Sequence, residues 1–199
     1  MPEHDKYFSS DQDPYLDQET NTLKNIPNLD TPEKLEAFET GIFQAVFADA
    51  SKYIASKKTI NLSNWKELHK ACFSDVYVWA GELRTVRIAK ENTVFAYPET
   101  IESEAHKLFT QMEEDFQQGN LTLDKTAEYF AEINVLHPFR EGNGRTQRIL
   151  FTEILNRIGY TIDYTLTNQN EIIIAMIHGY NGDYDPIKRL FHKITQSVK

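Results

Sequence analysis

The sequence contains a single cysteine, Cys72, among 199 residues. One thiol excludes an intramolecular disulfide scaffold and a zinc site built on four cysteines. Glycine and proline are also scarce, with 8 and 7 residues, which leaves no room for long low-complexity linkers. The length predicts one domain with at most a small extension, and the single cysteine fits a reducing compartment.

Long apolar runs are absent as well. The longest strongly apolar stretch covers only residues 172–177, which is far too short to span a bilayer. The first residues, including Glu3 and Lys6, form no apolar core of a signal peptide. Lys and Arg total 21 against 30 Asp and Glu, so the formal charge is -9 with neutral His. Because an acidic surface repels phosphate backbones and anionic lipids, we expect neither a nucleic acid nor a membrane as a partner.

Helical periodicity dominates the chain after residue 30. Thr31 and Pro32 form a good helix start, and Leu35, Phe38 and Ile42 then recur on one helical face. Further helices are predicted after residue 63, from about residue 99, and over 124–136, 144–158, 168–179 and 184–196. Residues 1–30 are polar and turn-prone, so they are predicted to be an N-terminal extension that packs on a domain of residues 31–199.

Residues 83–97 follow a different pattern. Val86 and Ile88 alternate with polar residues, a polar turn follows at residues 90–93, and Val94 and Phe95 resume the apolar pattern. This alternation predicts a β-hairpin. The predicted fold class is therefore all-α, a helical bundle with one small β-hairpin.

One run of twelve residues combines the groups of a polyphosphate site. It reads His137-Pro138-Phe139-Arg140-Glu141-Gly142-Asn143-Gly144-Arg145-Thr146-Gln147-Arg148. Gly142 and Gly144 would let the backbone take positive φ and approach a ligand closely. The loop leads into a helix N-terminus, whose free N–H groups favour an anion. Arg145 and Arg148 are three residues apart and share a helical face, so two guanidinium groups would face the same anion.

Two further groups in this run suit chemistry on a nucleotide. Glu141 supplies one carboxylate, which is adequate for Mg²⁺ when phosphate oxygens complete its shell. His137 has the ordinary pKa of a residue that transfers protons near neutrality. Taken one at a time, each feature has an ordinary structural alternative: a histidine at a helix end, a glycine turn, or a solvated arginine face. Their concentration within twelve residues favours the functional interpretation.

The run resembles the signature of the Fic family, with every defining position present. The resemblance extends to residues 68–87, which are similar to the segment before the Fic hairpin, and to residues 90–98, which are similar to its target-docking flap. Residues 13–16 and 22–25 resemble the start of toxin-type Fic chains. Similarity therefore covers most of the chain from about residue 13, and it implies the helical Fic fold with the hairpin as the flap.

The resemblance also implies an activity, the transfer of AMP from ATP to a Tyr, Ser or Thr hydroxyl of a target protein. His137 would be the base that deprotonates this hydroxyl, Phe139 a buried anchor of the loop, and Glu141 the ligand of Mg²⁺. The residues implied in nucleotide binding are Gly142, Asn143, Gly144, Arg145, Thr146, Gln147 and Arg148 of the motif and Thr93, Val94, Phe95 and Ala96 of the flap. An extended target segment would pair with the edge of the flap by β-augmentation. Ile173 and Tyr180 are candidates for an adenine pocket, with core packing as the alternative for Tyr180.

The resemblance raises the question of regulation. Many Fic enzymes carry an inhibitory helix with the pattern Ser/Thr-x-x-x-Glu-Gly/Asn. Glu precedes Gly or Asn only at Glu91 and Glu141, and the residues four positions earlier are Arg87 and His137. Because the pattern is missing, a small antitoxin protein that carries this helix is the expected partner, and the chain is the expected toxin of the pair.

Other properties follow from the resemblance alone. A cytoplasmic bacterial enzyme is expected, with secretion into a host cell left open. Relatives modify a type II topoisomerase subunit or a GTPase, and either kind of target fits. Another Fic transferase activity, phosphorylation or phosphocholine transfer, is an alternative, although those branches tend to alter the Gly-Asn-Gly-Arg part that is unaltered here. A binding module without catalysis is a third interpretation, which the presence of both His137 and Glu141 disfavours.

Overall fold

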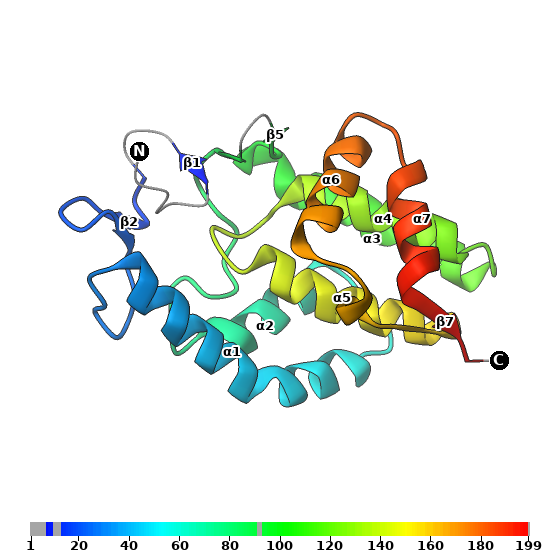
Figure 1. The fold of residues 1–199 in the computed structure, drawn as a ribbon, viewed down its shortest axis with the longest axis horizontal. Helices are drawn as coiled ribbons and strands as arrows, with labels where there is room; N and C mark the ends of the chain where they lie inside the picture. The colour runs from blue at the N-terminus through cyan, green and yellow to red at the C-terminus, as the bar shows by residue number, and fades with distance from the viewer. Residues whose placement is uncertain (1–6, 10–12, 91–92, 199) are drawn as a thin grey trace.

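The computed structural model describes residues 7–9, 13–90 and 93–198, and within them the chain forms seven α-helices (Figure 1). These are α1 (Pro32–Ala55), α2 (Leu62–Phe73), α3 (Pro98–Gln117), α4 (Leu123–Leu136), α5 (Asn143–Arg157), α6 (Gln169–Tyr180) and α7 (Asp185–Ile194). A short 3-10 helix, η1 (Tyr164–Leu166), precedes α6. The predicted helical fold is confirmed, and each predicted helix is present with shifts of a few residues at its ends.

Side-chain caps explain where several helices begin. The Thr31 side chain accepts a hydrogen bond from the backbone N–H of Lys34, and Pro32 occupies the first helical position of α1. Asn61 and Asn64 form a reciprocal capping box at the start of α2. Because the cap is Asn61, α2 begins slightly before the predicted position after Ser63.

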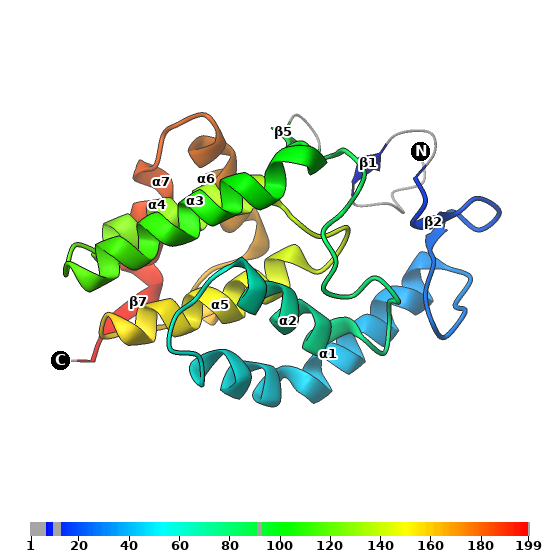
Figure 2. The same cartoon turned by 180° about the vertical axis from the view of Figure 1, so that it is seen from behind.

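Helices α4 and α5 form the centre of the fold. Helix α4 packs against α3, α5, α6 and α7, whereas α5 also packs against α1 and α2. Figure 1 and the reverse view in Figure 2 show α1 and α2 on one side of α5 and the other helices on the opposite side. Ile133 of α4 and Leu150 of α5 are fully buried in the shared core. The twelve-residue motif covers the loop between these two helices and the first turns of α5, so core helices hold it at both ends.

The strands are few and short. The flap hairpin consists of β4 (Ile88–Lys90) and β5 (Thr93–Val94), and β1 (Phe8–Ser9) pairs with the other edge of β4. Residues 91 and 92 of the predicted turn lie outside the described residues. Two further antiparallel pairs were not predicted, β2 (Leu16–Asp17) with β3 (Thr22–Leu23) and β6 (Tyr160–Ile162) with β7 (Thr195–Ser197).

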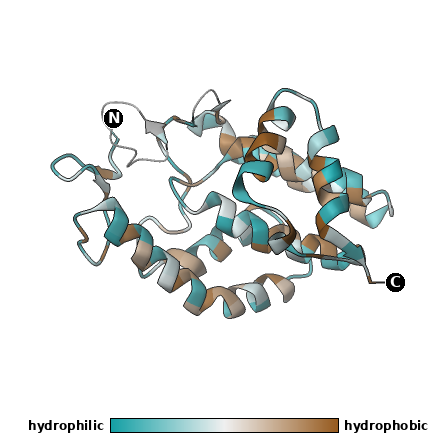
Figure 3. Ribbon diagram, viewed as in Figure 1, coloured by the Kyte–Doolittle hydropathy of each residue, from teal (hydrophilic) through white to brown (hydrophobic). Residues whose placement is uncertain are grey.

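The hydropathy of the residues differs between the helices and the connecting segments. Hydrophobic residues lie mainly along the helices, whereas the β2–β3 hairpin and the loop between α6 and α7 are largely hydrophilic (Figure 3). Within the described part of the chain, no helix is both long enough and apolar enough to cross a membrane.

Candidate active site

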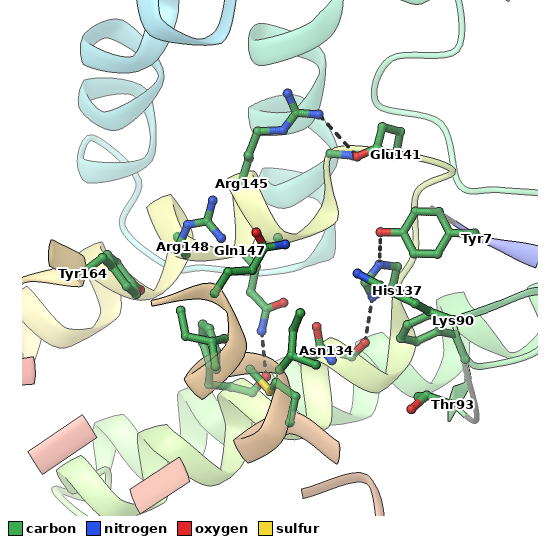
Figure 4. Close-up of a pocket in the computed structure, with 18 of the residues that line it drawn as sticks. Tyr7, Lys90, Thr93, Asn134, His137, Glu141, Arg145, Gln147, Arg148 and Tyr164 are labelled. Atoms are coloured by element: carbon green, nitrogen blue, oxygen red, sulfur yellow. Dashed lines mark hydrogen bonds and ion pairs between the residues drawn. The ribbon is translucent and has the colours of Figure 1, made fainter. Parts of the chain in front are cut away.

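A cavity of about 530 Å³ lies where the flap, the α4–α5 loop, α1 and α6 meet (Figure 4). His137, Glu141, Arg145 and Arg148 all line it, together with Gly142 and Gly144. The apolar part of the wall comes mainly from α6, with Ile172, Ile173, Met176 and Ile177. One hollow therefore presents an imidazole, a carboxylate and two guanidinium groups beside an apolar surface, which is a suitable arrangement for a nucleotide.

The backbone of the α4–α5 loop is held in an uncommon conformation. His137 ends α4 in the left-handed region, with φ 42° and ψ 61°, and Gly142 begins α5 with φ 81°. A Cβ atom at Gly142 would come within 2.4 Å of the Phe73 ring, so only glycine fits there. Gly144 differs from the expectation, because it lies in the first turn of α5 and is not among the positive-φ residues.

Asn143 holds the loop together from inside. Its side chain accepts a hydrogen bond from the backbone N–H of Phe139 at 2.9 Å and donates one to the Phe139 carbonyl at 2.8 Å. The Phe139 ring is fully buried, stacks on His69 with ring centroids 3.9 Å apart and meets the edge of Trp65. Phe139 is thus buried as expected, and Asn143 braces the loop rather than lining the cavity.

His69 is a second fixed point of the loop. Its Nδ1 accepts a hydrogen bond from the Gly81 N–H at 2.9 Å, so its Nε2 carries the proton and donates to the Glu141 carbonyl, also at 2.9 Å. Complete burial lowers the pKa of His69 to about 4, which keeps the ring neutral. His69 therefore positions the backbone of the residue that precedes Gly142.

The tautomer of His137 follows from its neighbours. Its Nδ1 lies 3.1 Å from the carbonyl oxygen of Asn134, which can only accept, so Nδ1 carries the proton. Nε2 therefore has a free lone pair, and it accepts a hydrogen bond from the Tyr7 hydroxyl at 2.8 Å (Figure 4). The Phe95 ring stacks on the imidazole with centroids 3.9 Å apart. Burial lowers the pKa of His137 to about 3, so the imidazole is neutral and can accept a proton.

The two arginines of the motif have different surroundings. Arg145 forms ion pairs with Glu39 of α1 at 2.9 Å and with Glu141 at 3.3 Å. Burial opposes the charge of Arg145, but the two carboxylates outweigh it and raise its pKa. Burial lowers the pKa of Arg148, for which no carboxylate among the described residues offsets the loss of water. An anion in the cavity would offer Arg148 that compensation.

Glu39 is a cavity residue that the sequence pattern did not indicate. It is buried, and its carboxylate also accepts a hydrogen bond from the Tyr77 hydroxyl. Burial and the nearby Glu141 raise its pKa. Glu39 is more than one hundred positions from Arg145 in the sequence, so no local spacing could reveal the pair.

Replacing Glu39 with glutamine is expected to strengthen binding of Mg²⁺–ATP by about tenfold, because it removes a buried negative charge beside Arg145. The amide retains an acceptor for Tyr77 and Arg145, so the packing should persist. Calorimetric titration measures the change. Glu36→Gln is the matched control, since Glu36 lies one turn earlier, also lines the cavity and is exposed. Weaker binding in Glu39→Gln would show that Glu39 instead holds Arg145 in its binding position.

The flap is tied to the motif loop by Arg84, which is buried. Its guanidinium donates to four backbone carbonyls, those of Val86, Ala96, Leu136 and His137. Burial lowers the pKa of Arg84 to about 10, so the side chain remains charged at neutral pH. The backbone N–H of Arg84 also donates a hydrogen bond to the Pro138 carbonyl at 2.8 Å. One side chain therefore joins both ends of the flap to the segment that carries His137.

The N-terminal segment also contacts the motif. Asp13 forms a buried ion pair with Arg140 at 2.8 Å, and both side chains are almost completely inaccessible to water. Lys24 and Tyr15 are joined by a backbone hydrogen bond across the β2–β3 hairpin. The segment that the sequence assigned to an extension thus contributes a buried partner to the motif loop.

The structure separates the predicted nucleotide-binding residues into two groups. Those that line the cavity are Thr93, Phe95, Gly142, Gly144, Arg145, Gln147 and Arg148. Those that do not line it are Val94, Ala96, Asn143 and Thr146.

The residues of the second group face away from the cavity, either because they contact other parts of the protein or because they are exposed to solvent. The Thr146 hydroxyl accepts a hydrogen bond from the Trp65 indole at 2.9 Å, and the Ala96 N–H donates to Val135. Val94 is 49% exposed, because side chains alternate along the flap. Of the two adenine-pocket candidates, Ile173 lines the cavity and Tyr180 does not.

The donor set suits a divalent cation that arrives with a nucleotide. Among the described residues, no group of three His, Cys, Asp or Glu side chains could hold a metal ion. Glu141 lines the cavity with one carboxylate, whose Oε1 accepts hydrogen bonds from the Gly142 N–H and from Arg145. A single carboxylate beside phosphate oxygens fits Mg²⁺, which takes few protein ligands.

Acid is expected to destabilise the fold through His69 and His137. Because the native pKa values of about 4 and about 3 lie below the ordinary 6.5, the unfolded chain binds protons first as the pH falls. Each histidine then costs up to about 1.4 kcal/mol per pH unit below 6.5, so the free energy of unfolding should fall by about 4 kcal/mol between about pH 7 and about pH 5. Urea denaturation at the two pH values measures this loss. In His137→Ala the loss should be about half as large, and an unchanged loss would refute the buried neutral imidazole.

Known proteins match both the sequence and the fold. The Fic/DOC family matches residues 59–155. A probable protein adenylyltransferase of Sinorhizobium fredii, y4lH, is 32% identical over 191 residues, which cover 90% of this chain and 94% of that protein. The protein adenylyltransferase VbhT of Bartonella schoenbuchensis is 33% identical over 94% of this chain, a region that makes up 40% of VbhT.

Solved structures of low sequence identity share the fold. The N-terminal FIC domain of Bep8 from Bartonella sp. 1-1C has a TM-score of 0.81 at 23% identity, over 91% of this chain and 94% of that chain. BepC of Bartonella tribocorum, with bound AMPPNP, has a TM-score of 0.77 at 22% identity, over 94% of this chain and 98% of that chain. The arrangement of α4, the motif loop and α5 therefore belongs to a fold that recurs at low identity.

Proposed function

Because this chain belongs to the Fic/DOC family, we propose that it is a protein adenylyltransferase that moves AMP from ATP to a hydroxyl side chain of a target protein. The observation that carries the proposal is the unprotonated Nε2 of His137, a residue that lines the same cavity as Arg145 and Arg148. A binding module would need the cations but not a neutral base. Relatives named as protein adenylyltransferases that match most of this chain, y4lH and VbhT among them, support the same activity.

Each group of the cavity has a definite task in this reaction. His137 takes the proton of the target hydroxyl, so that the oxygen can attack the α-phosphorus and pyrophosphate can leave. Arg145 and Arg148 bind the outer phosphates and offset their charge. The N-terminus of α5, next to Gly142, presents backbone N–H groups to the anion. Glu141 would hold Mg²⁺, which supplies charge neutralisation at the phosphates when bound.

The flap would present the target. Thr93 and Phe95 line the cavity on the flap side, and Arg84 holds both ends of the flap against the segment of His137. An extended target segment that adds to the edge of such a hairpin would place its hydroxyl beside His137 without much side-chain selection. A Tyr, Ser or Thr in a type II topoisomerase subunit or a GTPase is a suitable acceptor of this kind.

A small antitoxin protein is the proposed inhibitor. The proposal depends on the missing Ser/Thr-x-x-x-Glu-Gly/Asn pattern, since a partner would have to supply the inhibitory helix. Co-expression with a small protein from a neighbouring gene that carries this pattern should yield a stable complex that transfers no AMP. Co-purification without inhibition would contradict the proposal.

The position of a radioactive label in ATP tests the activity itself. The chain is incubated with cell lysate, Mg²⁺ and ATP labelled at the α- or the γ-phosphate. Label that enters protein from the α-position only, and that is lost in His137→Ala, supports AMP transfer. Label from the γ-position would indicate phosphorylation, and no label from either would indicate binding without catalysis or another donor.

A further inference from the structure

The most informative contact outside the motif involves Tyr7, near the start of the chain. Its hydroxyl oxygen lies 2.8 Å from Nε2 of His137, and its ring lines the same cavity as Glu141 and Arg145 (Figure 4). The ring meets the imidazole edge-on with centroids 5.2 Å apart and lies 5.9 Å from the Arg140 guanidinium. Tyr7 is only 9% exposed, so this position is one of close packing.

The direction of this hydrogen bond is determined by the tautomer of His137. Since Nδ1 donates to the Asn134 carbonyl, Nε2 has no proton and can only accept. The Tyr7 hydroxyl therefore donates its proton to the lone pair that acts as the base in the proposed reaction. This is the relation that an acceptor hydroxyl needs to the base before proton transfer, with heavy atoms within about 2.6–3.2 Å.

The backbone after Tyr7 also occupies the position of a target. Strand β1 pairs antiparallel with β4 of the flap, with Phe8 opposite Ala89 and Ser9 opposite Ile88. Because β5 pairs with the other edge of β4, β1 adds a third strand to the hairpin. β-Augmentation by a target would produce the same arrangement: an added strand on the flap sheet and a hydroxyl at His137.

From these two observations we propose that Tyr7 is a modification site at which this chain adenylylates itself. The inference rests on the proposed AMP transfer from ATP. The Tyr7 oxygen attacks the α-phosphorus, so that the Oη–P bond forms while the bond from the α-phosphorus to the bridging oxygen of the β-phosphate breaks. The proton passes to Nε2 of His137, pyrophosphate leaves, and the product is a phosphodiester between Tyr7 and AMP.

The geometry makes this reaction intramolecular. Tyr7 and His137 are 130 positions apart in the sequence, yet the fold holds them in contact within one chain. A hydroxyl held beside the base has a high effective concentration, so modification needs no encounter between chains. The rate constant of self-modification should therefore be independent of the concentration of the chain.

Mass spectrometry of the full chain after incubation with Mg²⁺ and ATP tests the proposal. Trypsin cuts after Lys6 and Lys24, so the peptide of residues 7–24 carries both Tyr7 and Tyr15. We expect AMP on Tyr7, with loss of the modification from this peptide in Tyr7→Phe. Tyr15→Phe is the matched control that should retain it, because the Tyr15 hydroxyl is bound by the Thr85 N–H at 3.1 Å and does not line the cavity.

A lysate in the same reaction separates the two possible failures. Lysate proteins that acquire α-label while the 7–24 peptide stays unmodified, or carries AMP on Tyr15 alone, would overturn the proposal and leave the proposed function intact. A rate constant that rises with the concentration of the chain would overturn the intramolecular geometry. If neither the chain nor any lysate protein acquires α-label, the proposed function fails, and self-adenylylation fails with it.

Discussion

Replacing His137 with alanine is expected to lower the rate of AMP transfer by about 10²–10⁴-fold, which is the usual contribution of a general base. The variant loses the imidazole nitrogen that is placed to take the proton of an acceptor hydroxyl, whereas Arg145, Arg148 and the α5 N-terminus remain. ATP affinity should therefore stay within about twofold of the wild-type value, because the phosphate-binding groups are unchanged. Single-turnover transfer of α-labelled AMP and calorimetric titration of Mg²⁺–ATP measure the two effects separately.

Two further variants sharpen this result. His106 lies exposed on α3, so His106→Ala controls for the loss of an imidazole elsewhere and should keep the wild-type rate. His137→Asn keeps a residue that tolerates the left-handed conformation of this position, where φ is 42°. If His137→Asn folds, binds ATP and still transfers AMP at the wild-type rate, then His137 is not the base.

Replacing Arg84 with methionine is expected to lower the free energy of unfolding by about 3–5 kcal/mol. Methionine fills most of the same space but leaves four backbone carbonyls without their donor, including those of His137 and Ala96. A buried acceptor that loses its partner costs about 1–3 kcal/mol. The total stays below four times this cost because water can reach some of the four carbonyls when the flap loosens. Urea denaturation followed by circular dichroism measures the change.

Arg87 provides the control for this prediction. It lies three residues later on the same segment, is exposed and packs its guanidinium over the Tyr97 ring at 3.9 Å. Arg87→Met should cost less than about 1 kcal/mol, as expected for an exposed cation–π contact. If the free energy of unfolding of Arg84→Met also falls by less than about 1 kcal/mol, then backbone pairing, and not the Arg84 guanidinium, holds the flap to the motif loop.

The helices were predictable because their signals are local. The Thr31 cap, the Pro32 start and the apolar spacing from Leu35 onward lie within a few residues of one another, and the structure places α1 where they indicate. The short strands were less predictable. Strands of two or three residues, such as β2 and β6, show no periodic pattern, and the pairing of β6 with β7 joins segments more than thirty positions apart.

The motif was predictable for the same reason, but its surroundings were not. His137, Glu141 and Arg145 share one loop and helix, so their grouping follows from twelve consecutive residues. Asn143 and Thr146 were expected at the nucleotide, and yet both turn inward, because the loop needs internal donors and acceptors at Phe139 and Trp65. A motif shows which residues are near a site, and only packing determines which side each one faces.

The sequence by itself determined the helical class, the flap hairpin, the family and the set of groups at the motif, because each depends on residues close together in the chain. The tertiary structure alone decided which distant groups act on them: Glu39 on Arg145, His69 on the Glu141 backbone, Arg84 on the His137 backbone and Tyr7 on the His137 side chain. These contacts join positions between 53 and 130 residues apart. Such pairs arise when the helices pack and water is excluded from between them, and the desolvation that keeps His137 neutral arises at the same step.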